Sequence, residues 1–254
     1  TVAKVLEKNS HYLADLITRE QGKPLSGHGS RFEMEACVFW TQVPAGFSIG
    51  PKVVYEDDTR KDTLDRVPFG VVAAVAPANW PLLVAIWQIM PAIRMGNTVV
   101  LKPSQHTPIA TLEMVRLINQ VLPPGVLNTV TGDRRIGSTL TSHPDIDRIM
   151  FTGSEATGRR IIENSAHNLA PITLRLGSND AAIALPGIDI NSFAQDLFWS
   201  AFLNTGQSCA CIKRLYVQED DYEEVMSALG AVARRMLIGD GIDENVLIGP
   251  MQNK

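Results

Sequence analysis

The hydrophobic residues of this chain form apolar runs that alternate with helical segments. The run Val71–Ala76 has the length of a strand, and the largely apolar segment Trp80–Met95 after it has the length of a helix. A continuous apolar run is typical of a parallel strand that is buried on both faces. The same pattern predicts strands in four further ranges, which are 98–101, 126–130, 147–151 and 180–185. We therefore predict an α/β fold with a doubly wound, mainly parallel, Rossmann-like sheet and helices on both faces.

Two segments near the N-terminus depart from this alternation. In residues 2–17 apolar positions recur at helical spacing among charged residues, which predicts a surface helix that ends near Gly22. In residues 49–68 short alternating segments flank the polar turn Glu56–Arg60. This second pattern predicts a β-hairpin.

Composition and charge narrow the class of protein. The 254 residues carry a net charge of -4 and are 45% hydrophobic, which gives no electrostatic basis for nucleic-acid binding and favours a soluble protein that acts on a small molecule. No run approaches the roughly 18 apolar residues that span a membrane, and no charged-then-apolar leader opens the chain. The three cysteines lack the spacing of a disulfide framework or of a zinc site. We expect a cytoplasmic protein with no metal site and no membrane partner.

Polar residues stand where the predicted strands end. Asn79 follows the strand 71–76, and Lys102 follows the strand 98–101. Because ligands bind at the carboxyl ends of strands in open α/β sheets, both side chains are expected to face one crevice. Gly153–Gly158 follows another strand and opens a helix, so its amides could meet a pyrophosphate; a purely structural turn is the alternative.

A loop of small residues, Asn204–Cys211, contains two of the three cysteines. A thiol among backbone amides can act as a nucleophile, because cysteine is partly anionic at neutral pH and amides stabilise an oxyanion. The alternative is that Cys209 is a small buried hydrophobic residue, as free cysteines often are. The loop alone does not decide between these two interpretations.

Four motifs, taken in order, favour the nucleophile. They are Val75–Leu82, Asn97–Ser104, Phe151–Ser154 and Gly206–Cys209. With these motifs the chain resembles the aldehyde dehydrogenase superfamily over nearly its whole length. Members of that superfamily oxidise aldehydes through a cysteine thiohemiacetal with NAD or NADP. The resemblance therefore implies one of these cofactors and a small aldehyde or carbonyl substrate.

The resemblance also implies roles for individual residues. Cys209 would be the nucleophile, and the side-chain amide of Asn79 with the backbone N–H of Cys209 would stabilise the oxyanion, each donor being worth roughly 3 to 4 kcal/mol. Lys102 would contact the adenine ribose, and Ser154 would contact a phosphate. The residues expected to bind the cofactor are Ala76, Pro77, Lys102, Ser104, Gln105, Gly137, Phe151, Thr152, Gly153, Ser154 and Leu176.

Two positions of this site leave alternatives open. Gln105 stands where many family members have a glutamate that grips the ribose hydroxyls and repels a 2′-phosphate, so the neutral amide tolerates NADP as well as NAD. Cys211 is expected to pack in the interior, as is Cys37. The alternative for Cys211 is a disulfide with Cys209, or the resolution of an oxidised sulfur there.

One motif departs from the family pattern. Where the family usually carries Glu-Leu-Gly-Gly, this chain has Arg175–Ser178, so an arginine replaces the expected general base. Arginine stays protonated and cannot act as a base. A guanidinium near Cys209 would favour the thiolate, so attack could survive while deacylation slows by about 100 to 10,000-fold. Ser178 adds a Cβ where the bend is expected to need positive φ or a close backbone approach.

The resemblance finally implies a division of the chain. Residues 1–174 are expected to form a dinucleotide-binding domain with a protruding oligomerisation hairpin at about 50–68, and residues 175–254 the beginning of a second α/β catalytic domain. Compared with the family, a short N-terminal portion and most of the catalytic domain are expected to be missing. The hairpin implies a homo-oligomer or a complementing partner chain.

Three functions remain open on the sequence alone. The first is NAD(P)-dependent oxidation of an aldehyde to a carboxylate with impaired hydrolytic deacylation. The second is a non-redox enzyme that reuses the crevice and the thiol, and the third is an inactive pseudoenzyme that binds a dinucleotide or a partner. Arg175, Ser178 and the short chain favour the latter two over ordinary hydrolytic turnover.

Overall fold

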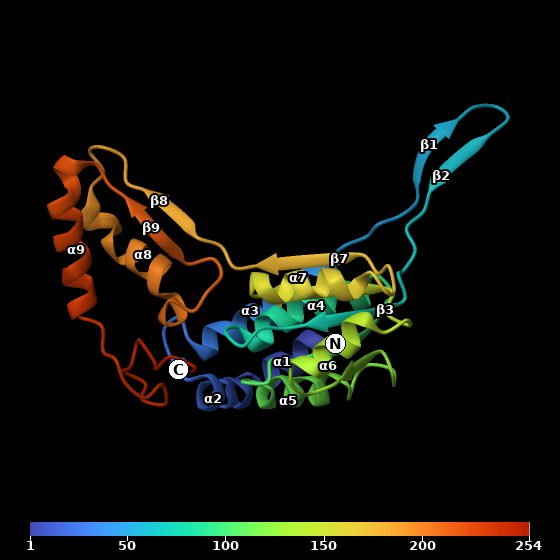
Figure 1. Cartoon of the computed structure of the whole chain (residues 1–254), viewed down its shortest axis with the longest axis horizontal. Coiled ribbons are helices and arrows are strands. Elements are labelled where there is room, and N and C mark those ends of the chain that lie inside the picture. Colours follow the sequence, from blue (N-terminus) through green and yellow to red (C-terminus); the bar gives the residue numbers. More distant parts are fainter. Residues whose placement is uncertain (254) are drawn as a thin grey trace.

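The computed structural model describes residues 1–253 and has a five-stranded parallel sheet at its centre (Figure 1). The strands lie in the order β5-β4-β3-β6-β7, so the chain winds from β3 in one direction and later returns to extend the sheet in the other. The bounds of the strands are β3 Val71–Val75, β4 Thr98–Lys102, β5 Leu127–Thr129, β6 Arg148–Gly153 and β7 Ile172–Leu176. The predicted doubly wound parallel sheet is confirmed.

Helices cover both faces of this sheet. Val72 and Ala74 of β3 pack into a core with α1 to α5, whereas Ala73 packs into a smaller core with α6 and α7. Because successive side chains of a strand point to opposite faces, a continuous apolar run is what this double coverage requires. The bounds of the helices are α1 Val2–Lys8, α2 Ser10–Gln21, α3 Ser30–Ala45, α4 Pro81–Arg94, α5 Ile109–Ile118, α6 Arg134–Ser142 and α7 Glu155–Ser165.

Two of these helices begin with side-chain caps at the carboxyl edge of the sheet. The carboxylate of Asp133 accepts the N–H of Arg135 at the start of α6, and the hydroxyl of Ser154 accepts the N–H of Thr157 at the start of α7. Asp and Ser are favoured N-caps because they satisfy backbone donors that have no partner within the helix. The caps thus fix where both helices start beside the ends of β5 and β6.

The predicted hairpin is also present. Strands β1 (Lys52–Glu56) and β2 (Lys61–Leu64) are antiparallel and project away from the main body (Figure 1). Asp57 closes the turn, because its Oδ1 accepts the N–H groups of Thr59 and Arg60. Every residue of β1 is exposed, including Val54 at 59%. A partner chain that covers this hairpin stays a prediction.

A smaller α/β unit follows β7. It contains the two-stranded parallel sheet of β8 (Asp180–Ile183) and β9 (Ile212–Tyr216), the helices α8 (Ile190–Phe202) and α9 (Tyr222–Arg234), and the short 3₁₀ turns η1 (Leu203–Gly206) and η2 (Glu219–Asp221). Phe198 and Val232 pack at the centre of its helix pair. The expected division between residues 174 and 175 falls inside β7, and the domain boundary stays a prediction.

The expectation that residues 180–185 form a buried strand is wrong. The strand exists, but its burial alternates, and Ile183 is 70% exposed. The physical reason is that β8 pairs only with β9 among residues 1–253, whereas the strands at the centre of the large sheet have neighbours on both edges. The apolar run therefore predicted the strand correctly but did not predict its burial.

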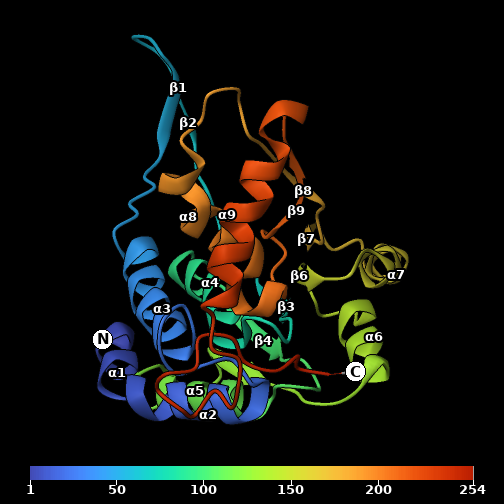
Figure 2. The same cartoon turned by 90° about the vertical axis from the view of Figure 1, so that its left-hand side faces the viewer.

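The segment after α9 returns to the N-terminal helices (Figure 2). The N–H of Leu25 donates to the carbonyl of Gly241 at 2.9 Å, and Arg31 forms an ion pair with Glu244. The last described residues therefore close over the end of α2. No helix within residues 1–253 combines the length and the apolar character that a membrane span needs. The same described residues contain no cluster of His, Cys, Asp and Glu suited to a metal ion.

Candidate active site

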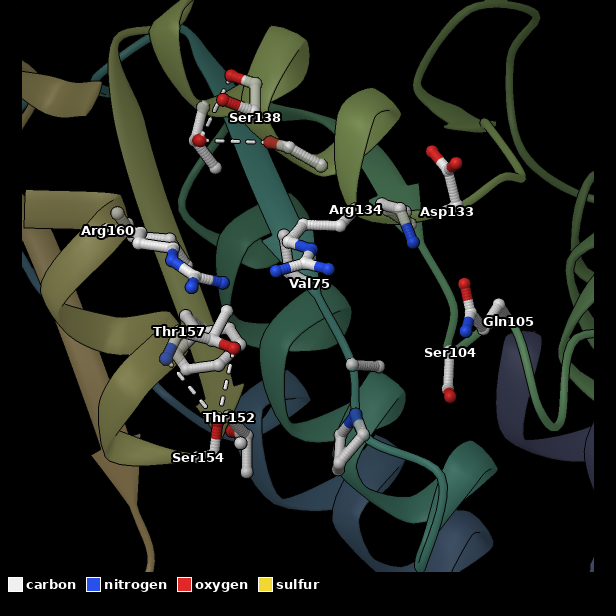
Figure 3. A pocket seen from close by; sticks show the side chains of 18 of the residues that line it. Val75, Ser104, Gln105, Asp133, Arg134, Ser138, Thr152, Ser154, Thr157 and Arg160 are labelled. Carbon is white, nitrogen blue, oxygen red and sulfur yellow. Dashed lines mark hydrogen bonds between the residues drawn. The ribbon is translucent and has the colours of Figure 1, made fainter. Parts of the chain in front are cut away.

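The carboxyl ends of β3, β4 and β6 open onto a cavity of about 850 Å³ (Figure 3). Its position agrees with the rule that ligands of doubly wound sheets bind where the strand order reverses. Every residue expected to bind a cofactor lines this cavity except Leu176. Leu176 packs against α7 instead, since a Cβ on Gly158 would lie 2.8 Å from its Cδ2.

Lys102 lines the cavity from the end of β4. Lys102 is only 7% exposed, and its Nζ donates to the carbonyl of Pro103 at 3.3 Å. Burial lowers the pKa of Lys102, and the carboxylate of Asp133 opposes that shift. An ammonium has three hydrogens to donate, so two remain for a ligand.

The turn from β6 to α7 brings a helix N-terminus to the same cavity. A Cβ on Gly153 would lie 2.5 Å from Cζ of Phe151, so a larger residue would displace that ring. Ser154 accepts from the N–H of Thr157 at 3.4 Å and donates to its hydroxyl at 3.1 Å. The unpaired amides and the dipole of such a helix start favour an anionic ligand.

Two arginines that sequence reasoning missed point into this cavity. Figure 3 shows the side chains of Arg134, from α6, and Arg160, from α7, directed towards each other across it. None of the ion pairs within residues 1–253 involves either side chain. Asp133, by contrast, already pairs with Arg135 at 3.0 Å. Among residues 1–253, the cavity therefore holds two guanidinium groups that have no carboxylate partner.

Signals for both arginines were present in the sequence. Arg134 stands at the first position of a helix that follows a strand, which is where the other cavity residues also lie. Arg160 lies three residues after Thr157 and four before Asn164, so helical spacing places the three on one face of α7. These patterns become informative only once the helices that carry them are known to border the cavity.

The cysteine loop follows α8 and has an unusual backbone. Asn204 and Thr205 have φ angles of 52° and 60°, and Gly206 follows with 72°. Left-handed conformations of non-glycine residues cost of order 1 kcal/mol each, so contacts around the loop must hold them. Thr205 donates its hydroxyl to the carbonyl of Gly249 at 3.2 Å, and Lys213 donates to the carbonyl of Gly206 at 2.8 Å.

Asn79 and Trp80 connect the large sheet to this loop. The amide nitrogen of Asn79 donates to the carbonyl of Gln207 at 2.7 Å, and the indole of Trp80 donates to the hydroxyl of Ser208 at 3.3 Å. Cys209 comes next in the chain and is partly exposed. An amide nitrogen carries two hydrogens, so Asn79 keeps one free beside the thiol-bearing loop.

Arg175 lies at the end of β7 next to Thr152 of β6. Its guanidinium carbon is 5.6 Å from the centre of the Trp87 ring, which is the geometry of a cation–π contact. It forms no ion pair among the residues that the structure describes. The position therefore presents a stacked cation and no group that could accept a proton.

Ser178 contacts the cysteine loop directly. Its hydroxyl donates to the carbonyl of Cys209 at 2.5 Å. Of the two alternatives expected at this bend, positive φ is wrong, because the non-glycine residues with positive φ within residues 1–253 are Leu169, Asn204 and Thr205. The close approach is the contact with the backbone carbonyl of Cys209. The serine fits without backbone strain and adds a hydrogen bond that a glycine could not make.

The other two cysteines are interior residues. Cys37 is 0% exposed and Cys211 is 1% exposed, as expected for packing. Burial raises the pKa of the Cys211 thiol, and its Sγ lies 3.5 Å from the carbonyl of Leu203. Cys209 is thus the most accessible thiol of the described chain.

Comparison with known proteins shows which family the chain belongs to. A sequence model described as the aldehyde dehydrogenase family matches residues 1–254, and the chain belongs to this family. The chain is 38% identical over 255 residues to a probable aldehyde dehydrogenase of a Pseudomonas species, with 99% of this chain and 51% of the relative covered. It is 36% identical over 263 residues to phenylacetaldehyde dehydrogenase of Pseudomonas fluorescens, with 100% and 52% covered.

Solved structures show the same architecture. The structure of 3,6-anhydro-L-galactose dehydrogenase in complex with NAP superposes with a TM-score of 0.93 at 34% identity, covering 100% of this chain and 54% of that one. PnpE in complex with nicotinamide adenine dinucleotide superposes with a TM-score of 0.93 at 34% identity, covering 99% and 52%. The chain thus spans about half the length of the curated relatives and solved structures that it matches.

Proposed function

We propose that this chain oxidises an aldehyde to a carboxylate with NAD or NADP through a thiohemiacetal and then a thioester on Cys209, and that hydrolytic release of the thioester is slow. The observation that carries this proposal is the 2.7 Å hydrogen bond from Asn79 to the carbonyl of Gln207. It holds a candidate oxyanion donor against the loop that bears the thiol, beside a cavity suited to a dinucleotide.

The residues of the cavity fit a dinucleotide. Its volume of about 850 Å³ lies within the range of small-molecule sites. Lys102 and the amides at the start of α7 favour the phosphate and ribose groups of such a ligand. A larger residue than Gly153 would press on the ring of Phe151, which also lines the cavity. NAD or NADP, when bound, supplies the acceptor for a hydride.

Attack on the substrate uses groups of this chain alone. The thiolate sulfur of Cys209 forms a bond to the carbonyl carbon, and the electron pair of the carbonyl moves to its oxygen. The free hydrogen of the Asn79 amide and the backbone N–H of Cys209 stabilise that oxyanion. Loss of a hydride from the former carbonyl carbon then re-forms the carbonyl as a thioester.

Hydrolysis of the thioester is the step for which this chain lacks the expected catalytic group. Hydrolysis needs a water whose proton moves to a base, and a guanidinium carries donors and no acceptor for that proton. The guanidinium of Arg175 is stacked on Trp87 and offers only donors. Without a base at this position we expect hydrolysis to lose the factor of about 100 to 10,000 that general-base catalysis supplies.

The cavity further favours a cofactor with a 2′-phosphate. Gln105 adds no negative charge, and the guanidinium groups of Arg134 and Arg160 face the cavity without a carboxylate partner in the described chain. Arginine recognises phosphate by paired, charge-assisted hydrogen bonds. We therefore propose that NADP binds at least as well as NAD.

Two other functions have support from one specific observation. The stacked Arg175 leaves the chain without the expected base, so it could also be a dinucleotide-binding pseudoenzyme or an enzyme that uses the thiol without redox chemistry. Such a protein would bind the dinucleotide but would form no reduced cofactor with any aldehyde.

Two measurements on the full chain test the proposal. Calorimetric titration with NAD and NADP should give saturable binding, and no heat at millimolar concentration would contradict the cofactor site. Mixing the loaded chain with a panel of aldehydes should then give a rapid burst of reduced cofactor near one equivalent per chain. Binding without a burst would leave the pseudoenzyme or the non-redox enzyme as the better function.

A further inference from the structure

A fully buried ion pair lies behind the cysteine loop. The side chains of Lys23 and Glu33 are both 0% exposed, and Nζ lies 2.7 Å from Oε2. Lys23 follows the left-handed Gly22 that ends α2, and Glu33 lies in the first turn of α3. Removing two charges from water is costly, so such a pair adds little net stability compared with apolar residues of similar size. The other contacts of the pair indicate what it does in this fold.

The ammonium of Lys23 contacts two residues next to the site. Its Nζ donates to the backbone carbonyl of Asn79 at 2.8 Å and lies 3.7 Å from the centre of the Trp80 ring. Burial lowers the pKa of Lys23, and the carboxylate of Glu33 opposes that shift. One buried cation therefore holds both the backbone of Asn79 and the indole ring that follows it.

The second oxygen of Glu33 holds the next segment of the chain. Oε1 accepts the N–H groups of Leu82 at 2.9 Å and Leu83 at 3.0 Å, in the first turn of α4. A carboxylate at a helix N-terminus satisfies donors that have no partner within the helix and complements its dipole. The ion pair thus fixes the backbone on both sides of the Asn79–Trp80 segment.

From this segment the contacts continue to the cysteine loop. Asn204, in its left-handed conformation, donates its side-chain amide to the same carbonyl of Asn79 at 2.8 Å. The amide of Asn79 in turn holds Gln207, and Trp80 holds Ser208. The carbonyl of Asn79 therefore receives one donor from the ion pair and one from the loop.

We propose that Lys23 and Glu33 are positioning residues that set the orientation of the Asn79 amide and of the cysteine loop for attack on the substrate. This inference rests on the proposed roles of Asn79 and Cys209. Neither residue of the pair lines the dinucleotide cavity, so the pair should act on the attack step and leave cofactor binding unchanged.

The alternative is that the pair only joins α2, α3 and α4. The chain offers a matched control for this possibility, because Thr18 and Ser30 form a buried hydrogen bond of 2.7 Å between α2 and α3. That bond involves neither Asn79 nor Trp80. A Thr18→Val variant should therefore lower the unfolding temperature without disturbing the cysteine loop.

The test compares Lys23→Met, the double variant Lys23→Met/Glu33→Leu and Thr18→Val in the full chain. The readouts are the rate of the reduced-cofactor burst, the rate at which iodoacetamide labels Cys209, and the affinity for NADP. The double variant leaves no unpaired charge in the interior, so we expect it to fold even if the single variant does not. We expect its burst to slow by about 100-fold, as for a misplaced catalytic group, with several-fold altered labelling and unchanged NADP affinity.

Each outcome decides the inference. A folded double variant whose burst and labelling equal those of the unaltered chain would overturn the positioning role, and so would a Thr18→Val variant with the same losses. If the unaltered chain gives no burst, the proposed function fails on its own. In that case the labelling rates of Cys209 still decide whether the ion pair orients the loop.

Discussion

The cysteine loop is held from two sides that differ in chemistry. On one side Asn79 donates its amide to Gln207, with the buried pair of Lys23 and Glu33 behind it. On the other side Ser178 donates to the carbonyl of Cys209, and Arg175, near the end of β7, stacks on Trp87. In the function we propose, the first side provides donors for the oxyanion, and the second lacks the base that hydrolysis needs. We therefore expect attack and release to depend on different segments, so that one can be altered while the other is kept.

The largest effect should come from removing the thiol of Cys209, which lies in the loop that both sides contact. Cys209→Ala should abolish the burst of reduced cofactor and the covalent adduct, a loss of at least about 1,000-fold, because no other group can form the thioester. Stopped-flow absorbance measures the burst, and mass spectrometry measures the adduct. Cys211→Ala is the matched control, since its thiol is only 1% exposed and should not be needed. A burst that survives Cys209→Ala would show that Cys209 is not the nucleophile.

The next largest effect should come from restoring a carboxylate on the releasing side. Arg175→Glu should raise steady-state turnover by about 100 to 10,000-fold, because a base can then take the proton of the hydrolytic water. Steady-state formation of reduced cofactor measures it. Arg175→Gln is the control, because it removes the positive charge without adding a base and should leave turnover low. Equal gains in both variants would mean that the charge of Arg175, and not the missing base, limits release.

On the attacking side, Asn79→Ala should slow the burst by about 100 to 1,000-fold through loss of one oxyanion donor. Its amplitude and the affinity for NADP should stay the same, since Asn79 does not line the cavity. Rapid-mixing kinetics with a saturating aldehyde measure the rate. Ser208→Ala removes the hydrogen bond to Trp80 but no oxyanion donor, so it should have a much smaller effect. An unchanged burst in Asn79→Ala would exclude it as the donor.

The smallest effect should be on cofactor affinity, through the cavity at the carboxyl edge of the sheet. Arg160→Ala should weaken NADP binding by about 10-fold and leave NAD binding nearly unchanged, because a charge-assisted hydrogen bond to the 2′-phosphate is lost. Titration calorimetry with each dinucleotide measures the difference. Arg159→Ala is the control on the same helix, since Arg159 pairs with Glu155 and does not line the cavity. Equal losses for NAD and NADP would place Arg160 at another part of the ligand.

The sequence predicted the large sheet well because its strands are buried on both faces, which leaves a continuous apolar run such as Val71–Ala76. The same signal predicted the position of β8 but not its burial, since Ile183 is exposed. An apolar run reports the tendency to form a strand, whereas burial depends on how many elements pack against that strand. Which elements pack against β8 is set by the tertiary fold, so the residues of β8 do not reveal it.

Within the site, Lys102 and Ser154 lie around one cavity, as the motifs at strand ends predicted, because the carboxyl ends of parallel strands share an edge. Asn79 was expected to face the same crevice, but it does not line the cavity and contacts the cysteine loop instead. The orienting groups were not predictable in this way. Lys23 contacts Asn79 across 56 positions of the chain, and a lysine is expected at the surface unless its partner is known. The family glycine at position 178 suggested positive φ, whereas the backbone of Ser178 does not have it.

The measurement that tests the separation of attack and release most directly is the acyl occupancy of Cys209 during turnover. The chain is mixed with NADP and an aldehyde, quenched at intervals and analysed by peptide mass. We predict that the unaltered chain accumulates close to one acyl group on Cys209 after the burst, because the thioester forms faster than water removes it. Arg175→Glu, treated in the same way, should show little adduct while reduced cofactor continues to form. Steady turnover by the unaltered chain with Cys209 free of acyl groups would contradict the account.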